Sequence, residues 1–427
     1  MKNIDRDILR IAIPSIIANI TTPLLGLVDM AIVGHMGNPI YIAAIAVGST
    51  IFSMIYWVFA FLRMGTSGMT AQAYGAGDRQ ERDASLYRAM SVAICVSILL
   101  IAFQSPIRSI MLHFFGSDVA TSALASQYFD ILIYGAPAAL GLSVVNGWMI
   151  GVQNSKLTMW TSLIINISNI IASLLFVYVA KLGISGVALG TLLAQWVGFC
   201  AGCLMLRSYR PHFTRFNVLF DPKKIKRFFS VNTDIFLRTL CLVAVTLWFT
   251  RASARQGDIV LAVNALLMQF FILFSYMMDG FAFAAEALVG KLTGAGQDAA
   301  KKEMIKRLFI VGSIVTLIFT SIYAISGDGI LSLLSSDKTV IAMSDNYIVW
   351  AVFIPIAGVA AFIWDGVFIG ETRTRQMLLS MLIAMALFFT IYFLLYSQLG
   401  NHALWLAFIA YLSARGIVQT MLYFIKK

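Results

Sequence analysis

The sequence predicts an all-α integral membrane protein with twelve transmembrane helices, arranged as two parallel six-helix lobes. Three observations lead to this fold class: the composition, a series of long apolar segments, and an internal repeat. The chain has 427 residues, of which 60% are hydrophobic and 12% are charged. Because a soluble domain carries about 25% charged residues, most of this surface must face something other than water.

The apolar segments are each long enough to cross a bilayer with a hydrocarbon core of about 30 Å. Glycine, proline and charged residues separate them. The first segment is too long for the apolar region of a secretory signal peptide and lacks a small-residue cleavage site. The expected spans are residues 8–33, 40–70, 85–104, 121–150, 158–180, 186–206, 228–250, 257–290, 304–326, 339–369, 376–399 and 402–425.

The distribution of lysine and arginine predicts that both termini are cytoplasmic. With twelve spans, the two termini and the loops after spans 2, 4, 6, 8 and 10 share one side of the membrane. That side carries 23 of the 31 basic residues, and the opposite loops carry five. An excess of this kind marks the cytoplasmic face. The net charge of +11 is therefore a topology signal, so we expect no nucleic-acid partner and expect contacts with membrane lipids.

An internal repeat relates the two halves of the chain at a nearly constant offset. A shift of 219 residues places Gly75–Gly77 on Gly294–Gly296 and Gly147–Gly151 on Gly366–Gly370, and a shift of 217 continues the match. Because each half has six spans, both halves enter the membrane from the same side, related by a pseudo-twofold axis along the membrane normal. Transporters built in this way bind substrate between the halves and alternate access by moving one against the other.

The repeat also predicts the domain organisation. We expect an N-lobe over residues 1–206, a basic cytoplasmic linker over 207–227, and a C-lobe over 228–427.

Charged side chains within the spans are candidates for function, because they are costly to place in a bilayer. Asp29 has apolar neighbours and no basic residue within one helical turn. Since burial favours the protonated form of a carboxylate, Asp29 could exchange a proton or bind Na⁺. Pro14 and Pro23 interrupt the same segment, and proline removes a helical hydrogen bond, which predicts a bendable helix. The alternative is that Asp29 extends to water at the outer interface.

The second half carries a larger set of charged residues. Asp234 and Arg238 are one turn apart and could pair, while Arg415 could neutralise Glu286 or Asp365. Asp279 and Glu286 are seven residues apart and share a helix face. The sequence leaves open whether these charges are structural or take part in coupling and gating. This C-lobe polar cluster consists of Asp234, Arg238, Asp279, Glu286, Asp365 and Arg415.

At this point the sequence resembles the MATE (multidrug and toxin extrusion) transporters, in their DinF-like branch. The most specific matching segments are Asp279–Gly290 and Trp364–Gly370, with Asn232–Thr239 and Val28-Asp29 in support, and the resemblance covers nearly the whole chain. It implies an antiporter in a bacterial inner membrane that exports organic, often cationic, compounds in exchange for H⁺ or Na⁺.

The resemblance also implies a cation site in the first lobe. The positions that match are Asp29, Tyr128, Asn146, Asn169 and Thr191, with Pro14 as the helix-bending proline. A Na⁺ ion would be held by Asp29, Asn169 and Thr191.

One position departs from the family pattern, because Ser173 stands where the family has a second aspartate. Hard cations prefer several charged or carbonyl oxygens, so we favour H⁺ over Na⁺ as the coupling ion. The sequence has no histidine cluster, no paired cysteine and histidine metal spacing and no nucleotide-binding loop. We therefore expect no other cofactor and no enzymatic activity.

Two other functions compete with drug efflux. One is a lipid-linked saccharide flippase, whose cavity tends to be markedly basic, whereas the first lobe here carries only Arg63 deep in the membrane. The other is a non-transporting membrane scaffold or sensor. No sequence feature sets the oligomeric state, and we expect a monomer.

Overall fold

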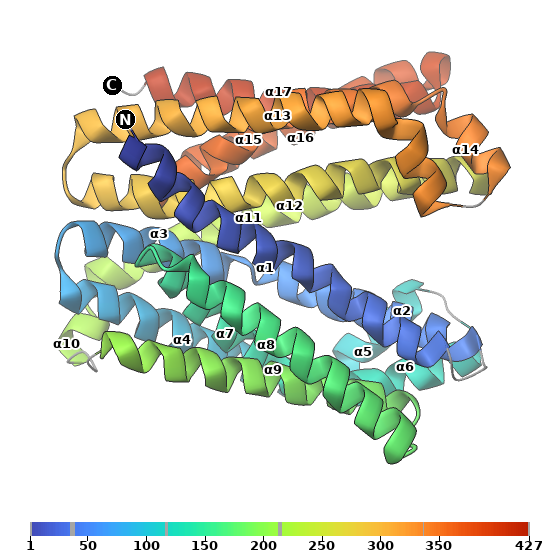
Figure 1. Ribbon diagram of the computed structural model, residues 1–427, viewed down its shortest axis with the longest axis horizontal. Helices are drawn as coiled ribbons and strands as arrows, with labels where there is room; N and C mark the ends of the chain where they lie inside the picture. Colours follow the sequence, from blue (N-terminus) through green and yellow to red (C-terminus); the bar gives the residue numbers. More distant parts are fainter. Residues whose placement is uncertain (1, 35–38, 116–117, 212–215, 336, 426–427) are drawn as a thin grey trace. The chain divides into compact units, whose positions relative to one another are not determined.

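The computed structural model describes residues 2–34, 39–115, 118–211, 216–335 and 337–425, and every regular element in that part of the chain is helical (Figure 1). The two C-terminal lysines and residues 212–215 of the expected linker lie outside the described residues. The helices up to residue 219 are α1 (Lys2–Gly34), α2 (Pro39–Val58), α3 (Phe61–Gly75), α4 (Arg79–Ala102), α5 (Gln104–Phe115), α6 (Val119–Leu132), α7 (Ala136–Gly151), α8 (Ser155–Leu174), α9 (Ile184–Leu206) and α10 (Phe216–Leu219).

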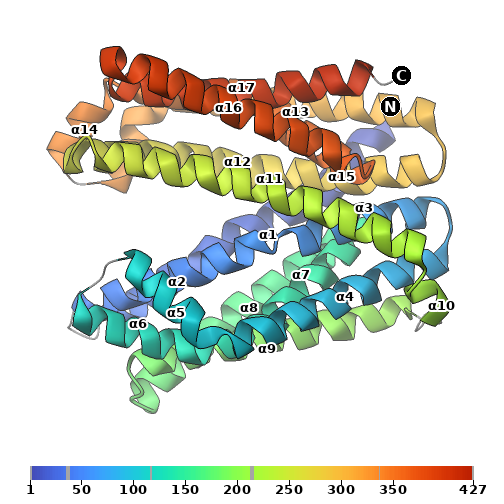
Figure 2. The ribbon, with the colours of Figure 1, turned by 180° about the vertical axis from the view of Figure 1, so that it is seen from behind.

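The remaining helices are mostly longer. They are α11 (Pro222–Ala254), α12 (Asp258–Gly294), α13 (Asp298–Leu334), α14 (Lys338–Ser344), α15 (Ile348–Gly370), α16 (Thr374–Leu399) and α17 (Asn401–Ile425). Short 3₁₀ segments occupy Ile133–Gly135 and Arg207–Tyr209, and a π-helical turn occupies Leu175–Val179. Helices α16 and α17 run side by side in both views (Figures 1 and 2).

Twelve helical stretches in the described part of the chain are long and apolar enough to cross a membrane, which confirms the predicted number. Two expected spans are interrupted. A turn at residues 59–60 separates α2 from α3, and a turn at Asp345–Tyr347 separates α14 from α15. Polar residues at the second break favour turns over helix interiors. Several helices also continue a turn or two beyond the predicted span, and the residues added at the start of α1 and of α11 are mostly polar.

The chain divides into two compact units, each of which contains six of the membrane-spanning stretches for most of their length. One unit is Ile13–Phe228, and the other combines Met1–Ala12 with Phe229–Lys427. This division differs from the expected one at the N-terminus, where the first part of α1 groups with the second unit. The basic segment 207–227 groups with the first unit.

The internal repeat is visible in the backbone. Left-handed residues end corresponding helices at Gly77 (φ +70°) and Gly296 (φ +67°), and again at Gln153 (φ 66°) and Thr372 (φ 53°). Each pair is separated by the predicted 219 residues. The turns after α3 and after α12 are closed by the same pattern of main-chain hydrogen bonds at the same offset. The two halves therefore share local geometry as well as sequence pattern.

Candidate functional site

Asp29 lies near the end of α1, where its side chain is only 3% exposed. Its Oδ2 accepts a hydrogen bond from Thr191 Oγ1 of α9 over 3.1 Å. The residues are 162 positions apart, so the packing of α9 places the hydroxyl against the carboxylate. The alternative in which Asp29 extends to the outer interface is wrong, because the side chain is enclosed by the helices of its own unit.

Helix α8 completes the surroundings of this carboxylate. Asn169 is fully buried, and its Nδ2 donates to Thr191 Oγ1 over 3.0 Å and to Ser173 Oγ over 3.4 Å. Ser173 and Asn169 also interact with Asp29. The close approach of α8 and α9 depends on Gly190, since a Cβ there would lie 2.3 Å from Ser173 Oγ. We call Asp29, Asn169, Ser173 and Thr191 the buried acid cluster.

Two oxygens of the buried acid cluster have no hydrogen-bond donor in the described part of the chain. Asp29 Oδ1 and Asn169 Oδ1 are buried and lack a hydrogen-bond partner among the described residues. Buried polar atoms are nearly always paired, so an orphaned pair of acceptors needs an explanation such as a proton or an ion. Across the described residues, no group of three or more histidine, cysteine, aspartate or glutamate side chains is placed to hold a metal ion. The cluster thus offers one carboxylate, with amide and hydroxyl oxygens around it.

Tyr128 joins the buried acid cluster, whereas Asn146 does not share its hydrogen bonds. Tyr128, on α6, is 2% exposed, interacts with Thr191 and lies within electrostatic range of Asp29. Asn146 of α7 instead accepts from Thr161 Oγ1 over 3.2 Å. Thr161 precedes Asn169 by eight residues on α8, which corresponds to about 12 Å of helix. The structure therefore gathers four of the five expected coupling residues, Asp29, Tyr128, Asn169 and Thr191.

Pro14 lies within α1, which continues through it as a helix, and its side chain is buried. Because proline has no N–H group, the carbonyl of Arg10 loses its helical donor. The boundary between the two compact units falls between Ala12 and Ile13. The helix that carries Asp29 is thus weakened next to the point where its packing changes from one unit to the other.

A second centre, in the other unit, is organised around Asp365 of α15. Its Oδ2 pairs with Arg238 of α11 and with Arg415 of α17, the latter over 2.6 Å. Its Oδ1 accepts from Gln419 Nε2 over 2.6 Å. Asp365, Arg238 and Arg415 are each no more than 6% exposed. Three helices are therefore joined by one buried carboxylate.

The expected pairing of Asp234 with Arg238 is wrong, because Arg238 extends across to Asp365. Asp234 instead accepts a hydrogen bond from Thr374 Oγ1 of α16 over 2.8 Å. Asp234 and Arg238 share a helix, but the carboxylate that pairs with the guanidinium lies on a neighbouring helix. Of the two partners considered for Arg415, the structure gives Asp365.

The other two acids of the C-lobe polar cluster lie on α12. Glu286 is 1% exposed, and Asp279 is half-buried. The main chain at Glu286 packs closely on α15, since a Cβ at Gly370 would lie 2.9 Å from Glu286 O.

Sequence reasoning missed two residues of the second unit that bond to expected site residues. Gln419 follows Arg415 by one turn on α17 and bonds to the same carboxylate. Thr374, at the start of α16, bonds to Asp234. The spacing of Gln419 from Arg415 was a usable signal, because residues four apart share a helix face. No sequence signal marks Thr374.

Comparisons with known proteins agree on one family. A family model described as MatE matches residues 14–200 and 235–394. DNA damage-inducible protein F of Escherichia coli K12 is 35% identical over 416 residues, which are 97% of this chain and 90% of that protein. Multidrug resistance protein MdtK of Yersinia pestis is 24% identical over 97% of this chain and 94% of its own length.

Solved structures of similar fold include a crystal structure of MATE in the bent conformation. It has a TM-score of 0.89 at 18% identity and covers 98% of this chain and 94% of its own. An outward-facing multidrug resistance MATE family transporter has a TM-score of 0.89 at 18% identity, with 99% and 97% coverage. At this level of identity the likeness concerns the fold.

Proposed function

This chain belongs to the MATE family of transporters, and we propose that it is an antiporter that exports organic compounds in exchange for protons. It is a multi-pass membrane protein and a transporter, not an enzyme. We propose cationic or amphipathic substrates, in line with the multidrug resistance named in relatives such as MdtK of Yersinia pestis.

The observation that carries the proposal is the orphaned oxygen of Asp29. A carboxylate that is 3% exposed, with one oxygen bonded to Thr191 and the other without a hydrogen-bond donor among the described residues, can take up a proton. The contacts of Asp29 in the described part of the chain are to hydroxyl and amide groups, which do not neutralise its charge. Gaining and losing a proton therefore changes the charge of a buried group, which can bias a two-state equilibrium.

Protons suit this cluster better than Na⁺. A Na⁺ ion at Asp29, Asn169 and Thr191 would have one carboxylate, one amide oxygen and one hydroxyl. Ser173 adds a hydroxyl where a second carboxylate would be needed for strong binding of a hard cation.

Helix α1 is the element that we propose to connect protonation with movement. It carries Asp29 at one end, and Pro14 interrupts its hydrogen bonding close to the boundary between the compact units. Bending at Pro14 would let the Asp29 segment move with the first unit while residues 1–12 stay with the second. Such a hinge is one of the recurrent ways in which proteins switch.

The Asp365 centre has a different character, and we propose a structural role for it. Its carboxylate oxygens are occupied by two guanidinium groups and one amide. Two cations offset the charge of this carboxylate, whereas the described contacts of Asp29 include no cation. We further propose that the protein acts as a monomer in a bacterial inner membrane, with both termini in the cytoplasm as its basic loops indicate.

Transport by the purified protein in liposomes tests the proposal. A cationic dye such as ethidium should move when a pH gradient is imposed, and Asp29→Asn should abolish that movement. Asp345→Asn is the matched control, because it also removes one carboxylate but at an exposed position.

The same preparation distinguishes the coupling ions. A Na⁺ gradient at equal pH on both sides should give no dye movement above the level of empty liposomes. Movement driven by Na⁺ alone would contradict proton coupling. If no imposed gradient moves any tested cation, and if Asp29→Asn behaves like wild type, antiport itself is contradicted.

A further inference from the structure

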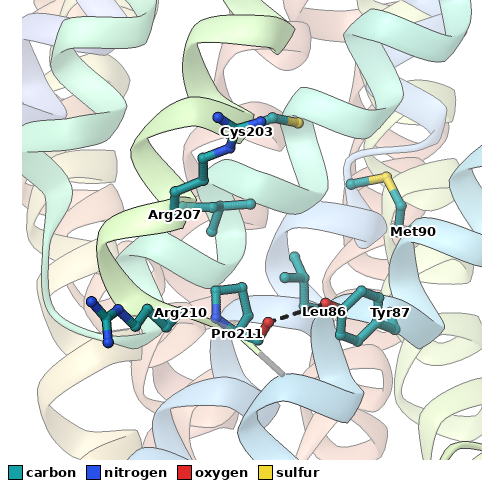
Figure 3. Close-up of a pocket in the computed structure, with 8 residues that line it drawn as sticks. Leu86, Tyr87, Met90, Cys203, Arg207, Arg210 and Pro211 are labelled. Carbon is teal, nitrogen blue, oxygen red and sulfur yellow. Dashed lines mark hydrogen bonds between the residues drawn. The ribbon is translucent and has the colours of Figure 1, made fainter. Parts of the chain in front are cut away.

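Each half of the chain carries an apolar groove at the same position in the repeat. The groove of the first unit, about 370 Å³, lies between α4 and the end of α9 (Figure 3). The groove of the second unit, about 400 Å³, lies between α13 and α17. We call them the α4–α9 groove and the α13–α17 groove.

The lining residues of the two grooves correspond through the internal repeat. The α4 and α13 sides match at the 219-residue offset, and the α9 and α17 sides match at the 217-residue offset. The matched residues are Leu86 with Ile305, Tyr87 with Lys306, Met90 with Phe309, Cys203 with Thr420 and Leu206 with Tyr423. Because five lining positions recur at equivalent places in the two halves, the grooves are a feature of the repeated unit.

The floors of both grooves are apolar. In the α4–α9 groove, Figure 3 shows Leu86, Tyr87 and Met90 across from Cys203. Tyr87 does not offer a free hydroxyl to the floor, because it donates to Pro211 O over 3.4 Å.

The α13–α17 groove is lined by aromatic rings around Trp364. Its ring centroid lies 5.1 Å from that of Phe309 and 4.5 Å from that of Tyr423. The indole N–H is already satisfied by Thr420 Oγ1 at 2.7 Å. Tryptophan and tyrosine gather where proteins meet the membrane–water interface.

Two exposed basic residues lie beside the apolar floor of each groove. Arg207 and Arg210 line the α4–α9 groove, and Lys302 and Lys306 line the α13–α17 groove. None of the four forms an ion pair within the described part of the chain.

Two acids near the grooves pair with other basic residues. Asp298 lies within electrostatic range of Lys302 but pairs with Lys301 over 2.9 Å. Asp83, one turn before Tyr87 on α4, pairs with Arg82 over 2.7 Å. The positive charge at each groove is therefore available to a ligand.

We propose that each groove binds one acidic phospholipid, with an acyl chain on the apolar floor and the phosphate against the two cations. Charge complementarity selects this occupant. A zwitterionic lipid would leave the two cations of a groove without a net partner, and free phosphate would make no use of the apolar floor. Both grooves lie at the basic end of their unit, which positive-inside reasoning assigns to the leaflet rich in anionic lipid. This inference goes beyond antiport and is independent of Asp29.

Native mass spectrometry of the detergent-purified protein tests the proposal by counting bound phosphatidylglycerol. Wild type should bind two molecules tightly. Arg207→Gln with Arg210→Gln should bind one, and so should Lys302→Gln with Lys306→Gln. The combined fourfold variant should bind none. Lys223→Gln with Lys226→Gln is the matched control, because it removes two exposed cations from the same basic region without touching either groove, and it should bind two.

Further measurements distinguish binding of an acidic lipid from binding of any lipid or of phosphate alone. Phosphatidylcholine should not bind at the same concentration, and inorganic phosphate should not compete. Arg207→Lys with Arg210→Lys should keep two bound lipids, which separates loss of charge from loss of fold. The proposal is overturned if groove variants keep wild-type stoichiometry, if the control loses lipid equally, or if phosphatidylcholine binds as well.

Discussion

Gly147 and Gly366 occupy the same position in the two halves of the chain and make the same contact. A Cβ at Gly147 would lie 2.3 Å from Arg63 O, and a Cβ at Gly366 would lie 2.3 Å from Ala282 O. Arg63 and Ala282 are themselves 219 residues apart. In both halves the main chains of two helices, α3 with α7 and α12 with α15, touch at a glycine. The backbone plan was duplicated while the charged side chains diverged.

We predict that alanine at either glycine lowers stability. Because the contacting atom is a main-chain oxygen, Gly147→Ala and Gly366→Ala must push two helices apart, and overpacking of this kind costs about 1–3 kcal/mol. Thermal unfolding in detergent should show a lower midpoint for both. Gly329→Ala, where a Cβ meets nothing within 4 Å, should leave the midpoint unchanged or raise it. Equal behaviour of all three variants would contradict the shared contact.

The number of spans, the internal repeat and its offset could be predicted from the sequence, because hydropathy and glycine spacing are local patterns. The interruption at Asp345–Tyr347 could have been anticipated from its turn-forming residues. The one at residues 59–60 could not, since Phe59 and Ala60 carry no turn signal. The grouping of residues 1–12 with the second unit is also invisible in the sequence, because it depends on the packing of α1.

The candidate site was predictable in part. Asp29 stands out as an unpaired acid in an apolar segment, but Thr191 and Asn169 came only from family resemblance. Their contact with Asp29 depends on how α8 and α9 are rotated. The same dependence explains the error over Arg238, since a partner on another helix cannot be ranked against Asp234 from spacing alone.

Neutralising Asp365 should destabilise the second unit. Asp365→Asn would leave Arg238 and Arg415 buried side by side without their shared carboxylate, and breaking a buried ion pair costs about 3–5 kcal/mol. The unfolding midpoint in detergent should fall sharply, and adding Arg415→Gln should recover part of the loss. Asp345→Asn serves as the exposed control. An Asp365→Asn protein as stable as wild type but inactive in transport would assign Asp365 to coupling instead of structure.

Removing the hydroxyl of Thr191 should impair coupling. Thr191→Val keeps the shape of the side chain but removes the hydrogen bonds that the hydroxyl makes with Asp29 Oδ2 and Asn169 Nδ2. A hydrogen bond to a charged group contributes about 1.5–3 kcal/mol, so proton-driven dye transport should fall by about tenfold or more. Thr191→Ser keeps the hydroxyl and should transport at close to the wild-type rate. Equal rates for the valine and serine variants would remove Thr191 from the site.

A second carboxylate should change the ion preference. Ser173→Asp would place an acid next to Asn169 and Asp29, because Ser173 already interacts with both residues. Two carboxylates meet the ligand preference of a hard cation better than one. Dye transport by this variant should respond to an imposed Na⁺ gradient, whereas Ser173→Asn, a neutral side chain of the same shape, should not. A Ser173→Asp protein that still ignores Na⁺ would show that the missing aspartate does not set the coupling ion.

The central claim, that Asp29 exchanges a proton during export, is tested most directly by following protons instead of dye. Proteoliposomes with a trapped pH indicator are given a gradient of ethidium and no pH gradient. For wild type, downhill dye movement should drive protons in the opposite direction and change the internal pH. Asp29→Asn should bind ethidium with wild-type affinity and move no protons. Dye-driven proton movement that persists at the wild-type rate in Asp29→Asn would contradict the account.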